Sequence, residues 1–197
     1  MEEIGISRNN NSRYIYIVLS QTGTVPAKLI KFYTRNPYAH ASIAFDSDLS
    51  EMYSFARRGI WNPFNSGFIK EDINSGIFGR YESTRCSIYK IEVTSEQYER
   101  IRSIIGVFKN DSLSYSYNYL GILGVVLHHP IARRKRYFCS QFVAYVLYMA
   151  GIKVANKVPA LVRPEDLRKS DLFQLVYAGR LSEYRTYLNE NSLYGVY

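Results

Sequence analysis

The stretch "NPYAHASIAFDSD", residues 36–48, has the composition of a β-strand but opens that strand with a histidine. The following "SEMYSFA", residues 50–56, predicts the returning strand of a hairpin. Strand alternation puts the His40 side chain on the same face as Ser42 and Ala44, whose small side chains leave room for another group. A valine at the first position would pack better, so we interpret His40 as a functional residue.

The flanking segments predict an α+β fold. Residues 13–21 and 85–93 are rich in β-branched and aromatic residues and predict strands. Helices are expected at residues 23–35, with Thr24 as the cap, and at residues 94–110, where Thr94 and Gln97 form a capping-box pattern.

Four further segments complete the interpretation. Residues 138–151 are apolar on almost every side and predict a buried helix that ends at Gly151. Residues 117–130 fit either a helix or a wall-forming loop. We read residues 57–84 as an irregular crossing with short strands, and residues 171–184 as a closing hairpin that turns at Ala178 and Gly179.

Length and composition predict one domain. The chain has 197 residues, 47% of them hydrophobic, which suffices for one core over residues 13–197 after a loose lead-in at residues 1–12. No stretch approaches the roughly 18 consecutive apolar residues of a membrane span, so we expect a cytoplasmic protein. Whether residues 57–80 form a lid is open at this stage.

The net charge of +8 favours anionic partners, and Arg133, Arg134, Lys135 and Arg136 concentrate part of it. This run fits a solvated loop, with a peripheral membrane contact or a nucleic-acid contact as the alternatives. No nucleic-acid-binding module accompanies it, so we expect no nucleic-acid partner. The sequence does not fix the oligomeric state.

Cys139 is the candidate nucleophile, because it lies at the start of the predicted buried helix. Unpaired N–H groups in a helix's first turn favour a thiolate. The thiolate requires a base, and His40 fits better than His128 and His129, which stand together before Pro130 in a predicted turn. No familiar metal-ligand spacing is present, so neither a metal nor another cofactor is expected.

The third member of such a site would orient the imidazole. We expect it on the strand after the hairpin turn, where Ser54 is the first choice and Glu51 the alternative if the register shifts by one residue. The oxyanion would be met by the N–H of Cys139 with a neighbouring donor. The candidates for that donor or for the pocket wall are Tyr14, Gln21, Tyr117, Asn118 and Ser140.

Several motifs together carry a resemblance to a known family. The histidine-led strand "YAHASIAFD", the polar position in "EMYSFA", and the later "YFCSQFVAYVL" and "RPEDLRKS" resemble the circularly permuted papain-like hydrolases of the NlpC superfamily, in the YiiX-type branch. The lecithin:retinol acyltransferase family shares this permuted order, in which the histidine precedes the cysteine. "YNYLGILG" is similar to the segment that precedes the cysteine in that family, with Asn118 where an aspartate is common.

The resemblance implies a permuted papain-like fold, in which a small antiparallel sheet packs against helices and the cysteine lies at a helix N-terminus. It also implies that Cys139 is the nucleophile and His40 the base of a thiol hydrolase or acyltransferase acting on an amide or ester through an acyl-enzyme. The expected substrate is a small molecule or a peptide-like or lipid-like acyl compound. The alternative is a non-catalytic module on the same fold that binds a lipid or small molecule. Cys86, within a predicted strand, should be an inert packing residue.

Overall fold

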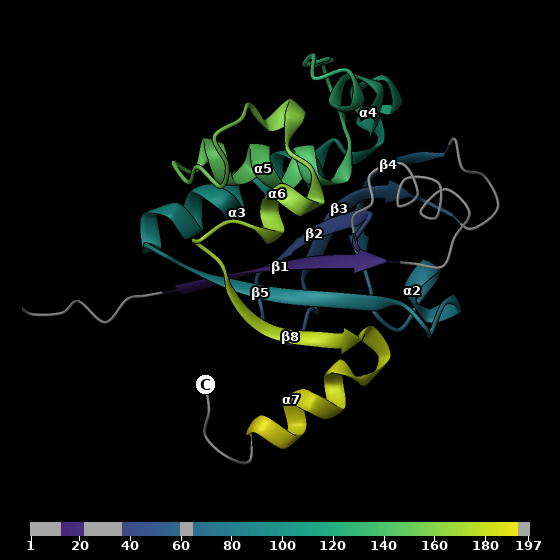
Figure 1. The fold of residues 1–197 in the computed structure, drawn as a ribbon, viewed down its shortest axis with the longest axis vertical. Helices are drawn as coiled ribbons and strands as arrows, with labels where there is room; N and C mark the ends of the chain where they lie inside the picture. The colour runs from purple at the N-terminus through teal and green to yellow at the C-terminus, as the bar shows by residue number, and fades with distance from the viewer. Residues whose placement is uncertain (1–12, 22–36, 60–64, 193–197) are drawn as a thin grey trace, which may run out of the picture.

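The protein is built around a six-stranded antiparallel sheet. The computed structural model describes residues 13–21, 37–59 and 65–192. Across the sheet the strands follow the order β4 (Ser66–Glu71), β3 (Met52–Arg57), β2 (His40–Ala44), β1 (Arg13–Gln21), β5 (Arg85–Val93) and β8 (Gln174–Arg180) (Figure 1). A separate parallel pair is formed by β6 (Ser116–Tyr117) and β7 (Arg136–Tyr137).

Helices cover both faces of this sheet. Those on one side are α3 (Ser95–Asn110), α5 (Cys139–Met149) and α6 (Pro164–Arg168), with α4 (Tyr119–Val126) beyond them (Figure 1). On the other side lie α2 (Gly76–Arg80) and α7 (Tyr184–Ser192). Short 3₁₀ turns occur at η1 (Ser112–Ser114), η2 (Pro159–Leu161) and η3 (Leu181–Glu183). Among the described residues, no helix has both the length and the apolar content needed to cross a membrane.

Strand β1 is buried on both faces over most of its length, which explains its unbroken apolar run. Ile17 and Leu19 point into the larger core with Phe142 of α5, whereas Tyr16 and Val18 point into a smaller core on the opposite face. A strand covered on both sides loses the polar positions that a half-exposed strand would show. The candidate site lies at one end of strands β1 and β2, where Ser20 pairs with His40.

The main strands and helices confirm the sequence-based assignment. The strands at residues 13–21 and 85–93 and the hairpin of β2 and β3 are present. Helix α3 has the predicted capping box, with Gln97 N bonded to Thr94 Oγ1 at 3.1 Å. Helix α5 ends at Met149, and two residues later Gly151 has a left-handed φ of 82°, so the predicted glycine allows the chain to turn away there.

The predicted closing hairpin at Ala178 and Gly179 is wrong. The chain runs straight through both residues as β8, which pairs with β5, and continues into η3 and α7. Gly179 is small for another reason, because a Cβ atom there would collide with the ring of Tyr177. Residues 117–130 contain helix α4, which decides between the two interpretations of that segment.

The crossing over residues 57–84 contains β4 and α2 in its described part. The expected lead-in at residues 1–12 and the expected helix at residues 23–35 lie outside the described residues. So does part of the segment that was considered as a lid.

Candidate active site

Cys139 is the first residue of α5 and is nearly buried, with 4% of its surface exposed. The preceding Phe138 is extended, and its backbone N–H donates to Gln141 Oε1 at 3.3 Å. This side-chain cap fixes the point at which α5 begins. The thiol therefore lies at the positive end of the helix dipole, where unpaired N–H groups favour an anion.

His40 is the first residue of β2 and faces Ser20 of β1. As predicted, its side chain shares a face with Ser42, whose Oγ lies 3.3 Å from His40 Nε2. That face belongs to the smaller core, whereas α5 packs on the larger one. The imidazole and the thiol can meet because each stands at the end of its element, and Cys139 Sγ lies 3.9 Å from the carbonyl oxygen of Ala39.

Glu71 is the residue that holds the imidazole. It is the last residue of β4, is 7% exposed, and places Oε1 2.8 Å from His40 Nε2. Ser42 Oγ donates to the other carboxylate oxygen. Because Nε2 is occupied by this carboxylate, Nδ1 is the nitrogen left to face the thiol.

The electrostatics of the site favour an ion pair between sulfur and imidazole. Burial alone would lower the pKa of His40, but the Glu71 charge and the hydrogen bonds with Cys139 and Glu71 raise that pKa to about 10. Burial would raise the pKa of the Cys139 thiol, yet the hydrogen bond and charge of His40, with the backbone N–H groups of Ala41 and Ser140, lower it. Burial likewise opposes the charge on Glu71, but His40 lowers the pKa of this carboxyl.

Tyr117 lies against the sulfur, as the sequence analysis considered. Its hydroxyl is 4.0 Å from Cys139 Sγ. Burial, together with the negative charge on Cys139, raises the pKa of Tyr117 well above its ordinary value, so the phenol stays protonated and can donate. The pairing of β6 with β7 places Tyr117 beside Tyr137, two residues before the cysteine.

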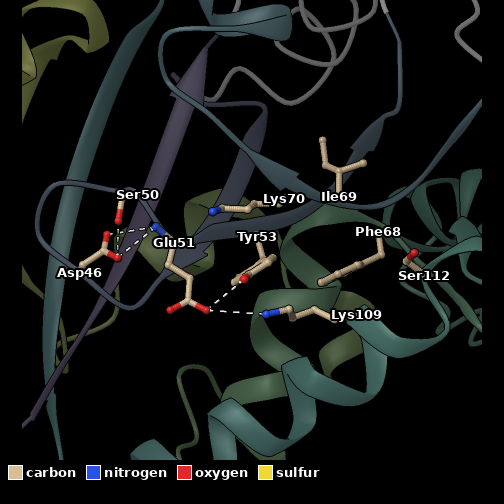
Figure 2. Close-up of a pocket in the computed structure, with 9 residues that line it drawn as sticks. All are labelled: Asp46, Ser50, Glu51, Tyr53, Phe68, Ile69, Lys70, Lys109 and Ser112. Atoms are coloured by element: carbon tan, nitrogen blue, oxygen red, sulfur yellow. Dashed lines mark hydrogen bonds and ion pairs between the residues drawn. The ribbon is translucent and has the colours of Figure 1, made fainter.

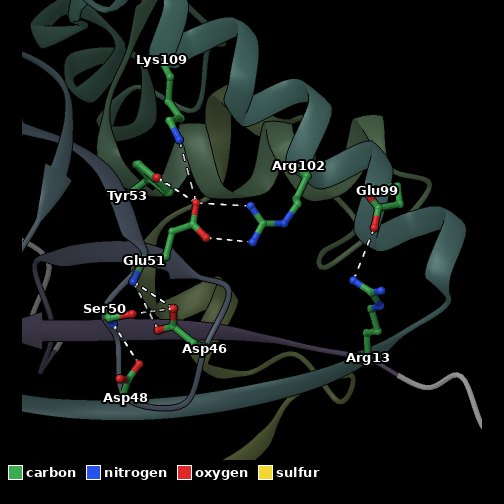
Figure 3. A network of polar contacts seen from close by, with 9 residues as sticks. All are labelled: Arg13, Asp46, Asp48, Ser50, Glu51, Tyr53, Glu99, Arg102 and Lys109. Atoms are coloured by element: carbon green, nitrogen blue, oxygen red, sulfur yellow. Dashed lines mark hydrogen bonds and ion pairs between the residues drawn. The ribbon is translucent and has the colours of Figure 1, made fainter.

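The predicted orienting residues are not the ones in contact with His40. Glu51 lies on the turn between β2 and β3, where Arg102 holds both of its oxygens at 3.3 and 2.8 Å (Figure 3). Tyr53 also donates to Glu51, at 3.0 Å. Glu51 is therefore committed to a surface network away from the thiol.

Ser54 is buried, but no hydrogen bond joins it to His40 among the described contacts. It lies on β3, between the strands that carry His40 and Glu71, and on the same face of the sheet. Ser54 is one of the neighbours that lower the pKa of the Glu71 carboxyl, after burial, which raises it, and His40 and Ser42, which lower it. The sequence analysis therefore placed the orienting residue on β3, whereas the residue that contacts His40 is Glu71 on the neighbouring strand β4.

Two candidate donors came from β1, and they lie at opposite ends of it. Tyr14 pairs with Glu92, six residues before the Ser20 position that faces His40, which places it about 20 Å along the strand from the site. Tyr14 is therefore excluded as a donor. Gln21 is at the correct end and shares a face with Leu19, on the side of α5, and it stays a prediction.

Asn118 and Ser140 have structural roles. The Asn118 amide caps α4 by accepting from Gly121 N at 3.0 Å and donates to Ile131 O at 2.9 Å. The Ser140 hydroxyl donates to Val162 O at 2.8 Å, which ties α5 to the segment before α6. Both side chains are buried and directed into these contacts, so neither hydroxyl nor amide lines the thiol.

A surface pocket of about 580 Å³ lies elsewhere on the molecule (Figure 2). Its walls come from the turn before β3, from β4 and from the end of α3, and its charged residues include Glu51, Lys70 and Lys109. Neither Cys139 nor His40 lines it. His128 and His129 are exposed and follow the end of α4.

Comparison with known proteins gives a likeness in structure. No protein-family profile matches the chain, and no curated protein sequence matches it. The crystal structure of the metalloprotein yiiX from Escherichia coli O157:H7 superposes with a TM-score of 0.56 at 15% identity, covering 86% of this chain and 99% of that one. The chain therefore has an α+β fold of the YiiX type.

Proposed function

We propose that the protein is a thiol hydrolase or acyltransferase that acts on an amide or ester carbonyl through an acyl-enzyme on Cys139. The observation that carries this proposal is the buried chain of contacts from Glu71 through His40 to the sulfur. Together with the helix end, these contacts lower the pKa of the thiol although burial opposes it. Buried thiols that serve only for packing have raised pKa values instead.

The proposed reaction has two stages. In the first, Cys139 Sγ attacks the carbonyl carbon, and the His40 imidazolium gives its proton to the leaving alcohol or amine as that bond breaks. In the second, His40 takes a proton from water or from another acceptor, which attacks the thioester carbonyl. The acyl group leaves on that acceptor, and the sulfur leaves as the thiolate beside the imidazolium. Glu71 holds the ring in place and stabilises its charged form.

The oxyanion formed in each stage requires donors. The Cys139 backbone N–H, at the start of α5, is one candidate, and the neutral Tyr117 hydroxyl is another. The YiiX structure is described as that of a metalloprotein. Within residues 13–21, 37–59 and 65–192, no group of three or more His, Cys, Asp or Glu side chains is placed to hold a metal ion, so no step is assigned to one.

The test measures alkylation of both cysteines by iodoacetamide against pH, read by mass spectrometry. Cys86 is the internal control, because burial raises its pKa to about 12. We expect Cys139 to react below pH 7 and Cys86 to stay unmodified. The protein is then incubated with p-nitrophenyl esters of increasing chain length, and the expected product is an acyl mass on Cys139.

Two results would contradict the proposal. One is a Cys139 thiol that titrates near the ordinary value of about 8.5. The other is a reactive thiol that accepts no acyl group from any ester or activated amide offered. Either result would favour a binding module with an idle thiol on the same fold.

A further inference from the structure

Helix α4 leaves a row of leucines uncovered. Leu120, Leu123 and Leu127 are 49%, 50% and 63% exposed, and they follow one another at the spacing of one helix face. Contiguous exposed apolar surface of this kind marks a contact with a membrane or with another protein. In Figure 1, α4 stands beyond α5, on the side of the molecule farthest from α7.

The exposure results from how the helix packs. The adjoining face carries Gly121 and Gly124, which are buried. A Cβ atom at Gly124 would meet the His129 carbonyl oxygen at 2.5 Å and Ile131 Cγ1 at 2.9 Å. The chain that leaves α4 therefore folds back along the glycine face. This close approach covers the glycines and leaves the neighbouring leucines exposed.

The chain that returns past Gly124 also carries positively charged side chains. Arg133, Arg134 and Arg136 lie on the turn after Ile131, and an antiparallel bridge closes that turn between Arg133 and Arg136. Among the described residues, no carboxylate lies within ion-pair distance of these three arginines, whereas Lys135 is paired with Asp111 at 2.6 Å.

The sequence around this turn contains no acidic residues. From residue 112 to residue 164 the chain contains no Asp or Glu and seven Lys or Arg. An exposed leucine row beside unpaired arginines, in a region without acids, is complementary to a surface that is apolar within and anionic at its boundary.

We propose that the outer face of α4 and the turn at residues 133–136 form a docking surface for an anionic lipid membrane. The leucines enter the boundary between headgroups and acyl chains, and the arginines contact the headgroups. This inference does not depend on the thiol chemistry. The Cys139→Ala variant is expected to bind membranes as the native protein does.

The test is sedimentation of the full chain with two kinds of vesicle, phosphatidylcholine alone and phosphatidylcholine with 30% phosphatidylserine. We expect binding to the anionic vesicles, weakened by added salt. The Leu120→Ser/Leu123→Ser variant should bind on the order of a hundredfold more weakly. The Arg133→Ala/Arg134→Ala variant should lose about thirtyfold in affinity.

Two matched control variants distinguish binding through this surface from non-specific adsorption to vesicles. Leu172→Ser/Leu175→Ser removes two leucines of similar exposure, 49% and 53%, next to and within β8 at the other edge of the sheet. Arg180→Ala/Arg185→Ala removes the same charge near α7. Both controls should bind the anionic vesicles as the native chain does.

Three results would overturn the inference. The first is no difference between the two vesicle types, and the second is an equal loss of binding in the control variants. The third is evidence that the α4 leucines and the arginines bind a different partner. This would be a dimer, seen in analytical ultracentrifugation, that Leu120→Ser/Leu123→Ser abolishes, or binding of RNA in place of vesicles with a steep salt dependence.

Discussion

The two cysteines of this protein are about equally buried and chemically opposite. Cys86 and Cys139 are 1% and 4% exposed. Cys86 is the second residue of β5 and lies opposite Gly179 of the edge strand β8, where burial raises its pKa to about 12. Cys139 begins a helix beside a charged histidine, and there the pKa of the thiol is lowered. Burial therefore does not decide whether a thiol is inert, since the nearest charge does.

The strongest test of this difference between the two cysteines is to remove the His40 charge next to Cys139. In His40→Ala the thiol keeps its burial but loses its ion pair, so its pKa should rise to that of an ordinary buried cysteine. We expect the alkylation rate of Cys139 at pH 6 to fall on the order of a hundredfold, because the thiolate fraction falls. An unchanged rate, with the thermal unfolding midpoint retained, would mean that the helix end alone activates the thiol.

Glu71→Gln tests the support behind the histidine. Losing this carboxylate should lower the pKa of His40 by about 1 to 3 units, which imidazole NMR can follow. Glu51→Gln is the matched control, because that carboxylate belongs to the Arg102 network and should leave His40 unchanged. If the His40 pKa shifts in both variants, or in neither, the assignment of Glu71 as the specific support of His40 is contradicted.

The same variant should change how stability depends on pH. The folded-state pKa of His40, about 10, is above its ordinary value of 6.5, so its contribution to stability is complete below pH 6.5 and is lost as the pH rises through about 10. In Glu71→Gln this loss should still begin near pH 6.5, but it should be smaller and complete at lower pH. Urea unfolding between pH 6 and pH 10 measures the difference.

Tyr117→Phe removes one donor near the sulfur and keeps the ring. The long contact of 4.0 Å predicts a modest effect, a rise in the Cys139 pKa of about one unit or less. If Tyr117 also meets the oxyanion, acylation by the p-nitrophenyl esters should fall more than alkylation does. Equal changes in the two rates would limit Tyr117 to the ground-state thiol.

Cys86→Ala is expected to have the smallest effect. It should reduce the free energy of unfolding by about 1 kcal/mol through lost packing and leave the alkylation profile of Cys139 unchanged. Urea denaturation and the mass-spectrometric assay together check both parts. A changed profile at Cys139 would show that the two thiols are coupled through the sheet.

Much of the frame could be predicted from local patterns. The β1, β2, β3 and β5 strands, helix α3 and the start of α5 each follow from signals contained within the segment itself, such as alternation or a capping box. The pairing of His40 with Cys139 was also expected. Contacts that depend on register between distant strands were less accessible.

Glu71 shows why. In "IKED", residues 69–72, it stands between Lys70 and Asp72 and resembles a solvated turn. Its burial results from the pairing of Glu71 with Met52 across β3 and β4, which puts it on the face opposite that of Lys70. Had residues 66–71 been recognised as a strand, alternation would have given Glu71 the same face as Ile69 and so pointed inward. The β8 error has a similar origin, because Ala178 and Gly179 resemble a turn until the Tyr177 ring is placed.

The Asn118 side chain has a mechanical consequence. Its amide holds the first turn of α4 and the carbonyl of Ile131, and its nitrogen lies 3.4 Å from Gln141 Oε1, the atom that caps α5. The projecting helix and the thiol-bearing helix are thus fastened to one buried amide. The first turn of α4 and the first turn of α5, which carries Cys139, are therefore linked by hydrogen bonds through Asn118 and Gln141.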